Sequence, residues 1–539
     1  MIKRLKLPVG IQTFETLRTE GYVYVDKTKH LINMIDSGQI YFLARPRRFG
    51  KSMTISTFDA LFSGKKELFK GLYAEEYLNR PDFRPRPVIR LDMSNIDTSK
   101  GIESMEETMC YLTQNVAKNI DVRLSNTKLC SALLDELIEA ASEKYGQKVV
   151  ILLDEYDKPY TDFVNDPEMA EKVRDVLRSY YVKIKTKDEY IRFTFITGIS
   201  KFAKLGVFST LNTLKDISLM PEYAEICGYS EEEIIRYFPD YLDETSKYMN
   251  VTTSELIEKM RYYYNGFAFD RHASVKLYNP FSTLLFLGEK EFFNYWIDTG
   301  SPKFIADYMK RHKVTVEQFR NLPITLDFAR SPGDVDTTPP EGFLYQSGYL
   351  TLHPFEGGGL ALDYPNTEVL NSMSKFVADN ILQQKGESFG SYNRRLMHAL
   401  MNNDYGLFKD ALNTLLASIP YDDFSKAAEE CILFGKYKFP AQEWLYRSCI
   451  LSFLRGCGVV VDAELHTCLG RPDLVISHNG IVWVIEIKVA YESESAVQKA
   501  EEAYRQIIDK QYAKPYPAAV CIGLGIDNSL RQITAMRTG

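Results

Sequence analysis

The segment RPDLVISHNGIVWVIEIK at residues 471–488 constrains the fold more strongly than any other stretch of the chain. Two apolar runs flank Asn479-Gly480, and an Asn-Gly dipeptide in that setting favours a β-hairpin with a two-residue turn. Such a turn fixes the register of the two strands, because each residue before it pairs with one residue after it. This register places Asp473 directly opposite Glu486.

Two facing carboxylates destabilise a sheet, and here the strand pair is apolar on both faces. Lys488 follows Glu486 by two residues and therefore lies on the same face. A divalent cation between the two acids would offset their repulsion, and Lys488 can then orient a water molecule or stabilise charge on a phosphate. We therefore predict a metal site at Asp473 and Glu486, with Mg²⁺ as the expected ion and Mn²⁺ as a second option; the same register pairs His478 with Ile481. The competing interpretation takes Asp473 as a strand cap and Glu486 with Lys488 as a surface pair.

The residues around the hairpin predict a small α/β domain at 431–539, in the order helix, three strands, helix, strand. The expected helices lie at 439–458 and 499–512, and the expected flanking strands at 459–465 and 518–526. Glu443, in the first turn of the first helix, is a candidate further metal ligand. Gln506 and Lys510 share one face of the second helix at i, i+4 spacing. The domain carries 12 Lys and Arg against 11 Asp and Glu, so its charge alone does not predict strong binding of nucleic acid.

The first 215 residues alternate strand-like and helix-like segments. Apolar runs rich in β-branched and aromatic residues lie at 39–45, 87–94, 148–156 and 191–198. Because helical stretches separate these runs, the alternation predicts a parallel sheet covered by helices on both faces.

The segment 42–64 predicts a strand, a loop and a helix that opens at Gly50-Lys51-Ser52. A phosphate-binding P-loop has this context: backbone N–H groups at the helix N-terminus bind phosphate, the lysine reaches the β- and γ-phosphates, and the serine hydroxyl holds Mg²⁺. Arg45 replaces the first glycine of the full pattern GxxxxGK[ST], so either Arg45 adopts the turn or the loop has another shape. The candidate nucleotide-binding residues of the loop are Arg47, Arg48, Phe49, Gly50, Lys51 and Ser52.

A second nucleotide signal is the strand KVVILLDEY, whose end presents Asp154 and Glu155. The first acid is suited to hold Mg²⁺ and the second to activate the attacking water. A later strand ends near Thr197 and Ser200, hydroxyl groups that are suited to sense the γ-phosphate. The competing interpretation treats the two acids as a solvated strand end and the arginines of the loop as a surface patch.

The centre of the chain is less informative. Residues 216–330 have a helical pattern and are rich in tyrosine, and residues 330–342 have the composition of a linker. The two segments 343–355 and 360–366 predict a small β-element. We expect a nucleotide-binding domain at 1–219, a helical lid at 220–330, a connector at 331–430 and the small α/β domain at 431–539.

The composition narrows the function class. A net charge of −7 argues against a general nucleic-acid coat protein, although it permits a local basic groove. The eight cysteines form no CxxC pair, which predicts reduced core residues. No apolar run approaches the roughly 20 residues of a membrane span, and the N-terminus lacks a signal-peptide core, so we expect a cytoplasmic protein without a membrane partner.

Two family resemblances rest on these residues. The C-terminal part resembles the PD-(D/E)XK nuclease superfamily through Pro472-Asp473, Glu486-Ile487-Lys488 and Gln506. The N-terminal part resembles a bacterial AAA-ATPase-like family that carries such a nuclease at its C-terminus, and in that family the arginine-rich loop is usual. The shared stretches are YVDKT (24–28), ARPRRFGKS (44–52), ILLDEYDKP (151–159), TGISKFAKLGVFSTLNTLKDIS (197–218), YNGFAF (264–269), YNPFS (278–282) and LYQSGYL (344–350). The resemblance implies metal-dependent phosphodiester cleavage at Asp473, Glu486 and Lys488.

The resulting hypothesis is an ATP-controlled, Mg²⁺-dependent nuclease, with DNA as the expected substrate and a homo-oligomer as one form of the assembly. Catalysis would rest on Glu155 in the ATPase site and on Asp473, Glu486 and Lys488 in the nuclease site. A second hypothesis is a nucleotide-gated sensor or scaffold whose nuclease-like domain binds nucleic acid without cleaving it. A third is an ATPase alone, with an inactive nuclease domain.

Overall fold

The computed structural model describes residues 4–163, 166–199, 214–298, 316, 319–325, 340–355, 358–383, 389–417, 441–462, 471–478 and 480–539. The chain separates into two compact units. The first contains residues 1–305 and 321–368, and the second contains 306–320 and 369–539. The four-domain division expected from the sequence stays a prediction.

The first unit is built on a five-stranded sheet in the order β2-β3-β4-β1-β5, in which every neighbouring pair is parallel. The strands are β1 (Ile40–Ala44), β2 (Val88–Asp92), β3 (Val149–Asp154), β4 (Ile191–Gly198) and β5 (Lys215–Asp216). The first four coincide with the four apolar runs. The predicted parallel sheet is therefore confirmed, and β5 is a short addition at its edge.

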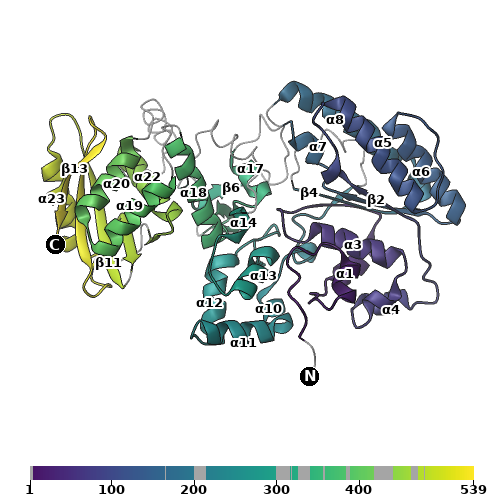
Figure 1. Ribbon diagram of the computed structural model, residues 1–539, viewed down its shortest axis with the longest axis horizontal. Coiled ribbons are helices and arrows are strands. Elements are labelled where there is room, and N and C mark those ends of the chain that lie inside the picture. Colours follow the sequence, from purple (N-terminus) through teal and green to yellow (C-terminus); the bar gives the residue numbers. More distant parts are fainter. Residues whose placement is uncertain are drawn as a thin grey trace. The chain divides into compact units, whose positions relative to one another are not determined.

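Helices cover both faces of this sheet, as the alternation predicts (Figure 1). On one face lie α1 (Phe14–Thr19), α3 (Lys51–Phe62) and α4 (Ala74–Leu78); on the other lie α5 (Ile102–Asn119), α6 (Cys130–Tyr145) and α8 (Pro167–Thr186). Two further helices are α2 (Thr28–Ser37) and α7 (Lys158–Thr161). The parallel strands are buried on both sides, which is why they read as continuous apolar runs.

The rest of the first unit is mainly helical. Its helices are α10 (Glu231–Tyr237), α11 (Pro239–Tyr248), α12 (Thr253–Tyr264), α13 (Pro280–Glu289), α14 (Tyr295–Asp298) and α17 (Pro340–Ser347). Capping boxes at Ser230 and Thr252 fix the starts of α10 and α12. A small antiparallel sheet in the order β6-β8-β7 contains β6 (Leu322–Ile324), β7 (Thr351–Pro354) and β8 (Leu360–Asp363). The predicted β-element is thus wrong at its start, because residues 343–347 belong to α17.

The second unit combines helices with a mixed sheet in the order β13-β12-β11-β10-β9. Its helices are α18 (Thr367–Gln383), whose first two residues belong to the first unit, α19 (Phe389–Asn402), α20 (Tyr405–Ala417), α22 (Ala441–Gly456) and α23 (Ala496–Asp509). Its strands are β9 (Val460–Asp462), β10 (Leu474–His478), β11 (Ile481–Ala490), β12 (Val520–Asp527) and β13 (Gln532–Thr538). The expected order of helix, three strands, helix and strand is present, and β13 is an additional strand that the sequence did not predict.

The hairpin has the register that its turn predicts. His478 pairs with Ile481 and Val475 with Val484, although the turn residue Asn479 lies outside the described residues. The two faces of the hairpin belong to different cores. Ile485 packs in the large core with α20 and α22, whereas Val484 packs in a smaller core beneath α23.

Helix α23 lies unusually close to β12 because two glycines face it. A Cβ atom on Gly525 would stand 1.9 Å from the Ala496 carbonyl oxygen, and one on Gly523 would stand 2.2 Å from the Ala500 carbonyl oxygen. Real side chains do not tolerate such distances, so only glycine permits this approach. The approach brings Gln506 of α23 within reach of the hairpin.

We predict that Gly525→Ala lowers the stability of the second unit, by about 1–3 kcal/mol, because α23 must move away from β12. Denaturant unfolding followed by circular dichroism measures the change. Gly288→Ala is the matched control, since a Cβ there meets only Leu7 Cδ1 at 3.6 Å. Equal stability of the two variants would contradict the prediction.

Candidate functional site

The loop between β1 and α3 differs in shape from the ordinary glycine-rich loop. Left-handed backbone occurs at Arg48 (φ 67°) and Gly50 (φ 99°), whereas Arg45 does not adopt it. Of the two alternatives for Arg45, the differently shaped loop is therefore the one observed. Gly50 caps α3, and its carbonyl accepts the first helical hydrogen bond from Thr54 N at 2.9 Å.

Arg45 is a structural residue of the loop. Its guanidinium is buried and donates to the carbonyl oxygens of Ala44 at 2.9 Å, Ser218 at 2.8 Å and Tyr223 at 3.2 Å. The same group lies 4.3 Å from the centroid of the Phe269 ring. Burial lowers the pKa of Arg45 to about 10. A glycine could make none of these contacts, so the arginine fixes the loop through its side chain.

Phe49 anchors the loop on the inside of the unit. Its ring is buried against Phe267 and Phe269, with centroid distances of 4.8 and 5.1 Å. Its carbonyl oxygen accepts a hydrogen bond from Gly228 N at 3.1 Å. The Phe49 side chain therefore faces the aromatic cluster, and only its backbone is available to a phosphate.

Lys51 is buried at the start of α3. Its ammonium group donates to the carbonyl oxygens of Arg45 at 2.9 Å and Pro46 at 3.0 Å. Burial lowers the pKa of Lys51, while Glu155 and Asp154 act in the opposite direction. The amine and the two acids therefore belong to one electrostatic site, as the P-loop interpretation requires.

Asp154 and Glu155 follow one another at the carboxyl end of β3. The Thr197 hydroxyl, on the neighbouring strand β4, donates to Asp154 Oδ1 at 2.5 Å. Glu155 has left-handed backbone (φ 50°), and burial raises its pKa, with further contributions from Asp154 and Asp157. The acids are thus not a solvated strand end. Ser200, the other predicted γ-phosphate residue, lies outside the described residues.

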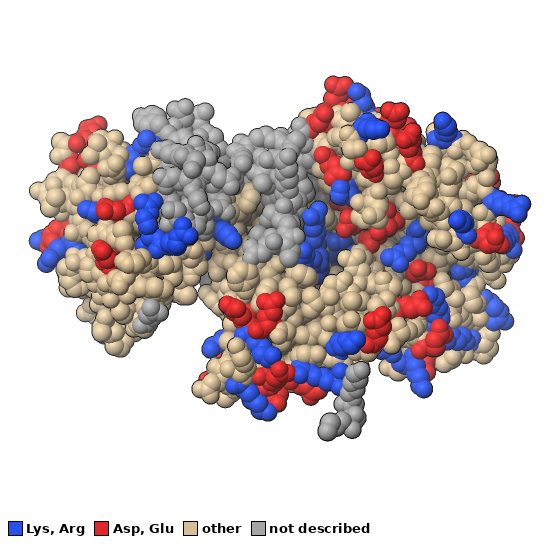
Figure 2. Space-filling view, viewed as in Figure 1, with Lys and Arg blue, Asp and Glu red and all other residues tan. Residues whose placement is uncertain are grey.

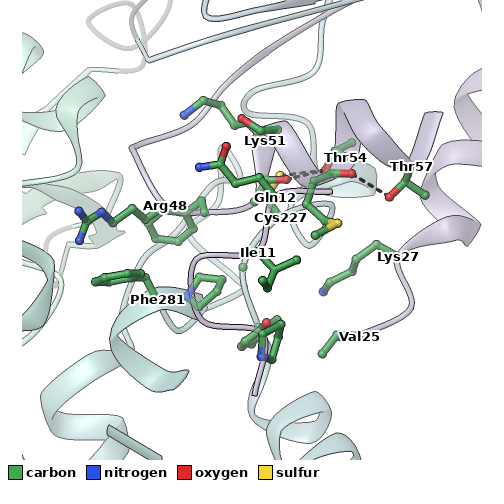
Figure 3. A pocket seen from close by; sticks show the side chains of 18 of the residues that line it. Ile11, Gln12, Val25, Lys27, Arg48, Lys51, Thr54, Thr57, Cys227 and Phe281 are labelled. Carbon is green, nitrogen blue, oxygen red and sulfur yellow. Dashed lines mark hydrogen bonds between the residues drawn. The ribbon is translucent and has the colours of Figure 1, made fainter. Parts of the chain in front are cut away.

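A cavity of about 580 Å³ adjoins this cluster. Figure 3 shows residues from three parts of the first unit around it, among them Lys51 of α3, Gln12 of the N-terminal segment and Phe281 of α13. Its polar lining includes Arg47, Arg48, Lys51, Ser52 and Glu155, and its apolar lining includes Ile11, Val25, Leu31, Ile226 and Leu284. One cavity therefore offers cations and hydroxyls for phosphates together with apolar walls for a base.

The second site lies on the hairpin of the second unit. Asp473 and Glu486 are buried, and Asp473 N donates to Glu486 Oε2 at 3.2 Å. Ile487 N donates to Asp473 Oδ2 at 2.8 Å, and the Gln506 amide donates to Glu486 Oε1. The two carboxylates therefore meet across the hairpin, as the register predicts, and the interpretation as a surface pair does not hold.

Two cations accompany these acids. Arg447 Nη1, on α22, lies 3.4 Å from Asp473 Oδ1. Lys488 Nζ lies 3.3 Å from Glu443 Oε1 and 3.8 Å from Glu486 Oε1. Lys488 thus stands between two carboxylates, one from the first turn of α22 and one from β11. Lys510 caps α23 and is exposed to solvent.

The electrostatics of this site fit a divalent cation. Burial and the neighbouring Asp473 raise the pKa of Glu486, and burial likewise raises the pKa of Asp473. Burial opposes the charge of Lys488, but Glu443, Glu486 and Asp473 together raise its pKa. Among the described residues no three His, Cys, Asp or Glu side chains form a ready metal cluster. The oxygen donors are nevertheless those that Mg²⁺ prefers, and added positive charge would let both acids ionise.

Sequence reasoning missed several residues of both sites. Arg447 had a visible signal, because it lies four residues after Glu443 and shares its helix face. Asp157 lies three residues after Asp154, and its carboxylate accepts a hydrogen bond from Ile199 N at 3.2 Å. No pattern marks it in the sequence, because it lies beyond the end of the apolar strand. Gln12 and the other cavity residues of the N-terminal segment belong to no phosphate motif, so only the structure places them.

Comparisons with known proteins agree with these two sites. A family model described as "Predicted AAA-ATPase" matches residues 8–208, and one for the PD-(D/E)XK nuclease superfamily matches residues 441–534. The chain belongs to the AAA-ATPase-like family and carries a PD-(D/E)XK nuclease superfamily domain at its C-terminus. It is 33% identical over 527 residues to a protein of Azotobacter chroococcum mcd 1 named "Uncharacterized protein in vnfD 5'region", covering 96% of this chain and 95% of that protein. Within the described part of the chain, no helix has the length and apolar character to cross a membrane.

We predict that Arg45→Gly, which creates the full GxxxxGK[ST] pattern, weakens the first unit. The substitution removes the three hydrogen bonds that the guanidinium donates to the Ala44, Ser218 and Tyr223 carbonyl oxygens, at a cost of about 2 kcal/mol. Thermal unfolding of the two proteins measures the loss. Arg84→Gly, at an exposed arginine, is the control; a variant Arg45→Gly as stable as wild type would show that the loop does not depend on this side chain.

Proposed function

We propose that the protein is a cytoplasmic, ATP-binding and ATP-hydrolysing enzyme that controls a Mg²⁺-dependent nuclease acting on DNA. The observation that carries the proposal is the meeting of Asp473, Glu486 and Lys488 in one buried site. The cavity beside Lys51 supplies the nucleotide half of the proposal. The family membership supports both halves at the level of domain class.

In the nucleotide site, the backbone of the loop and Lys51 bind the phosphates. Ser52 and Asp154 would hold Mg²⁺, which neutralises phosphate charge. Glu155 is suited to take a proton from the attacking water, because burial raises its pKa and so makes the carboxylate a stronger base. Arg47 and Arg48 add positive charge on the loop side of the cavity.

In the nuclease site, Asp473 and Glu486, with Glu443 as a further oxygen donor, would hold a divalent cation that polarises the scissile phosphate and lowers the pKa of a water molecule. Gln506 fixes the orientation of Glu486 by donating to its Oε1 atom. Lys488 presents its ammonium group beside Glu486, where it can stabilise negative charge on a phosphate oxygen or hold the attacking water.

A second candidate function is a nucleotide-gated sensor that binds nucleic acid without cleaving it. The hydrogen bonds and the Arg447 ion pair already occupy the carboxylates, which favours this alternative. On the face shown in Figure 2, Lys and Arg lie among Asp and Glu, and this mixed charge does not favour one function over the other. Catalytic assays separate the two functions, since only the enzyme nicks DNA.

We predict that the wild-type protein nicks supercoiled plasmid DNA in Mg²⁺ and that Glu486→Ala lowers the rate by at least about 100-fold, since it removes a proposed metal ligand. Glu486→Ala should bind ATP like wild type. Lys51→Ala should instead lower the affinity for ATP by about 10- to 100-fold.

Glu501→Ala is the matched control for the nuclease site, because the Glu501 side chain is 42% exposed and pairs with Arg505 and Arg537. Gel assays with plasmid, single-stranded DNA and RNA, and titration calorimetry with ATP, provide the measurements. Nicking that survives in Glu486→Ala at the wild-type rate would remove the nuclease proposal.

A further inference from the structure

Glu368 is a buried acid that neither proposed reaction uses. It lies in the first turn of α18 and is fully buried in the first unit. Its Oε1 atom accepts hydrogen bonds from the Trp296 backbone N–H at 2.8 Å and from the Ser282 hydroxyl at 2.9 Å. One carboxyl group therefore joins the start of α18 to α13 and α14.

The same two helices hold the phosphate loop. The Trp296 indole Nε1 donates to the Arg47 carbonyl oxygen at 3.4 Å, and the Arg48 guanidinium lies 4.0 Å from the centroid of the Phe281 ring. Close packing adds a third contact. A Cβ atom on Gly348 would stand 2.6 Å from Pro46 and 3.3 Å from the Trp296 ring. The Trp296 side chain thus fills the space behind the loop.

Helix α18 also packs tightly in the second unit, to which all but its first residues belong. A Cβ atom on Gly456, at the end of α22, would stand 2.8 Å from the Lys375 Cα atom of α18. Helix α22 is the element that carries Glu443 and Arg447. The first turn of α18 therefore contacts the support of the phosphate loop within the first unit, and its later residues pack against α22 within the second unit.

We propose that Glu368 is a positioning residue that ties α18 to the phosphate loop through Trp296, so that nucleotide bound in the loop acts on the nuclease site through α18. The inference rests on the proposed function, because it takes nucleotide binding and DNA cleavage as its two endpoints. A carboxyl group suits the role, since one oxygen accepts from two elements at once, whereas an alkyl side chain of similar size would join neither.

The first experiment follows the three tryptophans of the chain by ¹⁹F NMR of the full-length protein labelled with 5-fluorotryptophan. Trp296→Phe assigns one signal. On addition of Mg-ATP, the ¹⁹F signal of Trp296 should shift until the protein is saturated with nucleotide. In Glu368→Ala this shift should be smaller, and ATP binding should be weaker by about 3- to 30-fold. Glu368→Gln keeps an oxygen acceptor and should restore the response. Glu103→Ala, at an exposed first-turn glutamate of α5, is the control.

The second experiment measures plasmid nicking with and without saturating ATP. The ratio of the two rates should fall toward 1 in Glu368→Ala and in Trp296→Phe, which removes the indole N–H without touching the acid. The inference is overturned if both variants keep the wild-type ratio and Glu368→Ala keeps the wild-type Trp296 shift. If Lys51→Ala binds ATP as tightly as wild type, the proposed function fails instead, because the nucleotide then binds elsewhere.

The environment of Glu368 also predicts a pH dependence of stability. Burial raises its pKa to about 8, while Arg48 opposes the shift and the facing hydroxyls of Tyr264 and Tyr295 are neutral in this range. An acid whose pKa is higher in the folded than in the unfolded state contributes its full stabilisation at low pH. That contribution is lost as the pH rises through the pKa of the folded state. The Tm of wild type minus that of Glu368→Gln should therefore fall between pH 5 and pH 9. A constant difference would contradict a neutral, buried Glu368.

Discussion

The second unit depends on two carboxylates that are buried side by side. Burial and mutual repulsion both favour the protonated forms of Asp473 and Glu486, and folding must offset that cost with other contacts. The backbone, Arg447 and Gln506 supply these contacts. Helices α22 and α23 therefore do more than cover apolar faces of the sheet, because each delivers one polar side chain to the acids.

The first unit places the opposite charge in its interior. Arg45 and Lys51 are buried cations whose partners are mainly backbone carbonyl oxygens rather than acids. Carbonyl dipoles stabilise these cations, and the acids Glu155, Asp154 and Asp157 lie near enough to Lys51 to oppose the lowering of its pKa by burial. A loop that lacks its first glycine can hold this shape because Arg45 bridges three chain segments and Phe49 locks into an aromatic cluster.

Much of this arrangement follows from the sequence. The hairpin register could be predicted because Asn479-Gly480 admits one short turn, and the parallel strands because both their faces are apolar. Residues 343–347 were misjudged because a short apolar run fits a helix as well as a strand. Strand β13 was missed because it lies at the sheet edge, where half-exposed residues leave a weak alternation.

Contacts between distant segments could not be predicted in the same way. Trp296 and Arg47 are 249 positions apart, and no local pattern links an indole to a particular carbonyl group. The sequence predicts the candidate site residues and the fold to different extents. Motifs identified most charged groups of both sites but not Arg447 and Asp157, and supports such as Glu368 and Gln12 lack any motif and depend on tertiary packing alone.

The hydrogen bonds of Lys51 have a consequence for selectivity. The ammonium group donates to two carbonyl oxygens of its own loop, so an anion bound to Lys51 would compete with these contacts. A small anion such as inorganic phosphate gains little from that exchange. A chain of phosphates bound at the proposed site would also reach the N–H groups that open α3, and these additional contacts would offset what the lysine gives up. In the proposed nucleotide site, these hydrogen bonds would therefore favour a chain of phosphates over a single small anion.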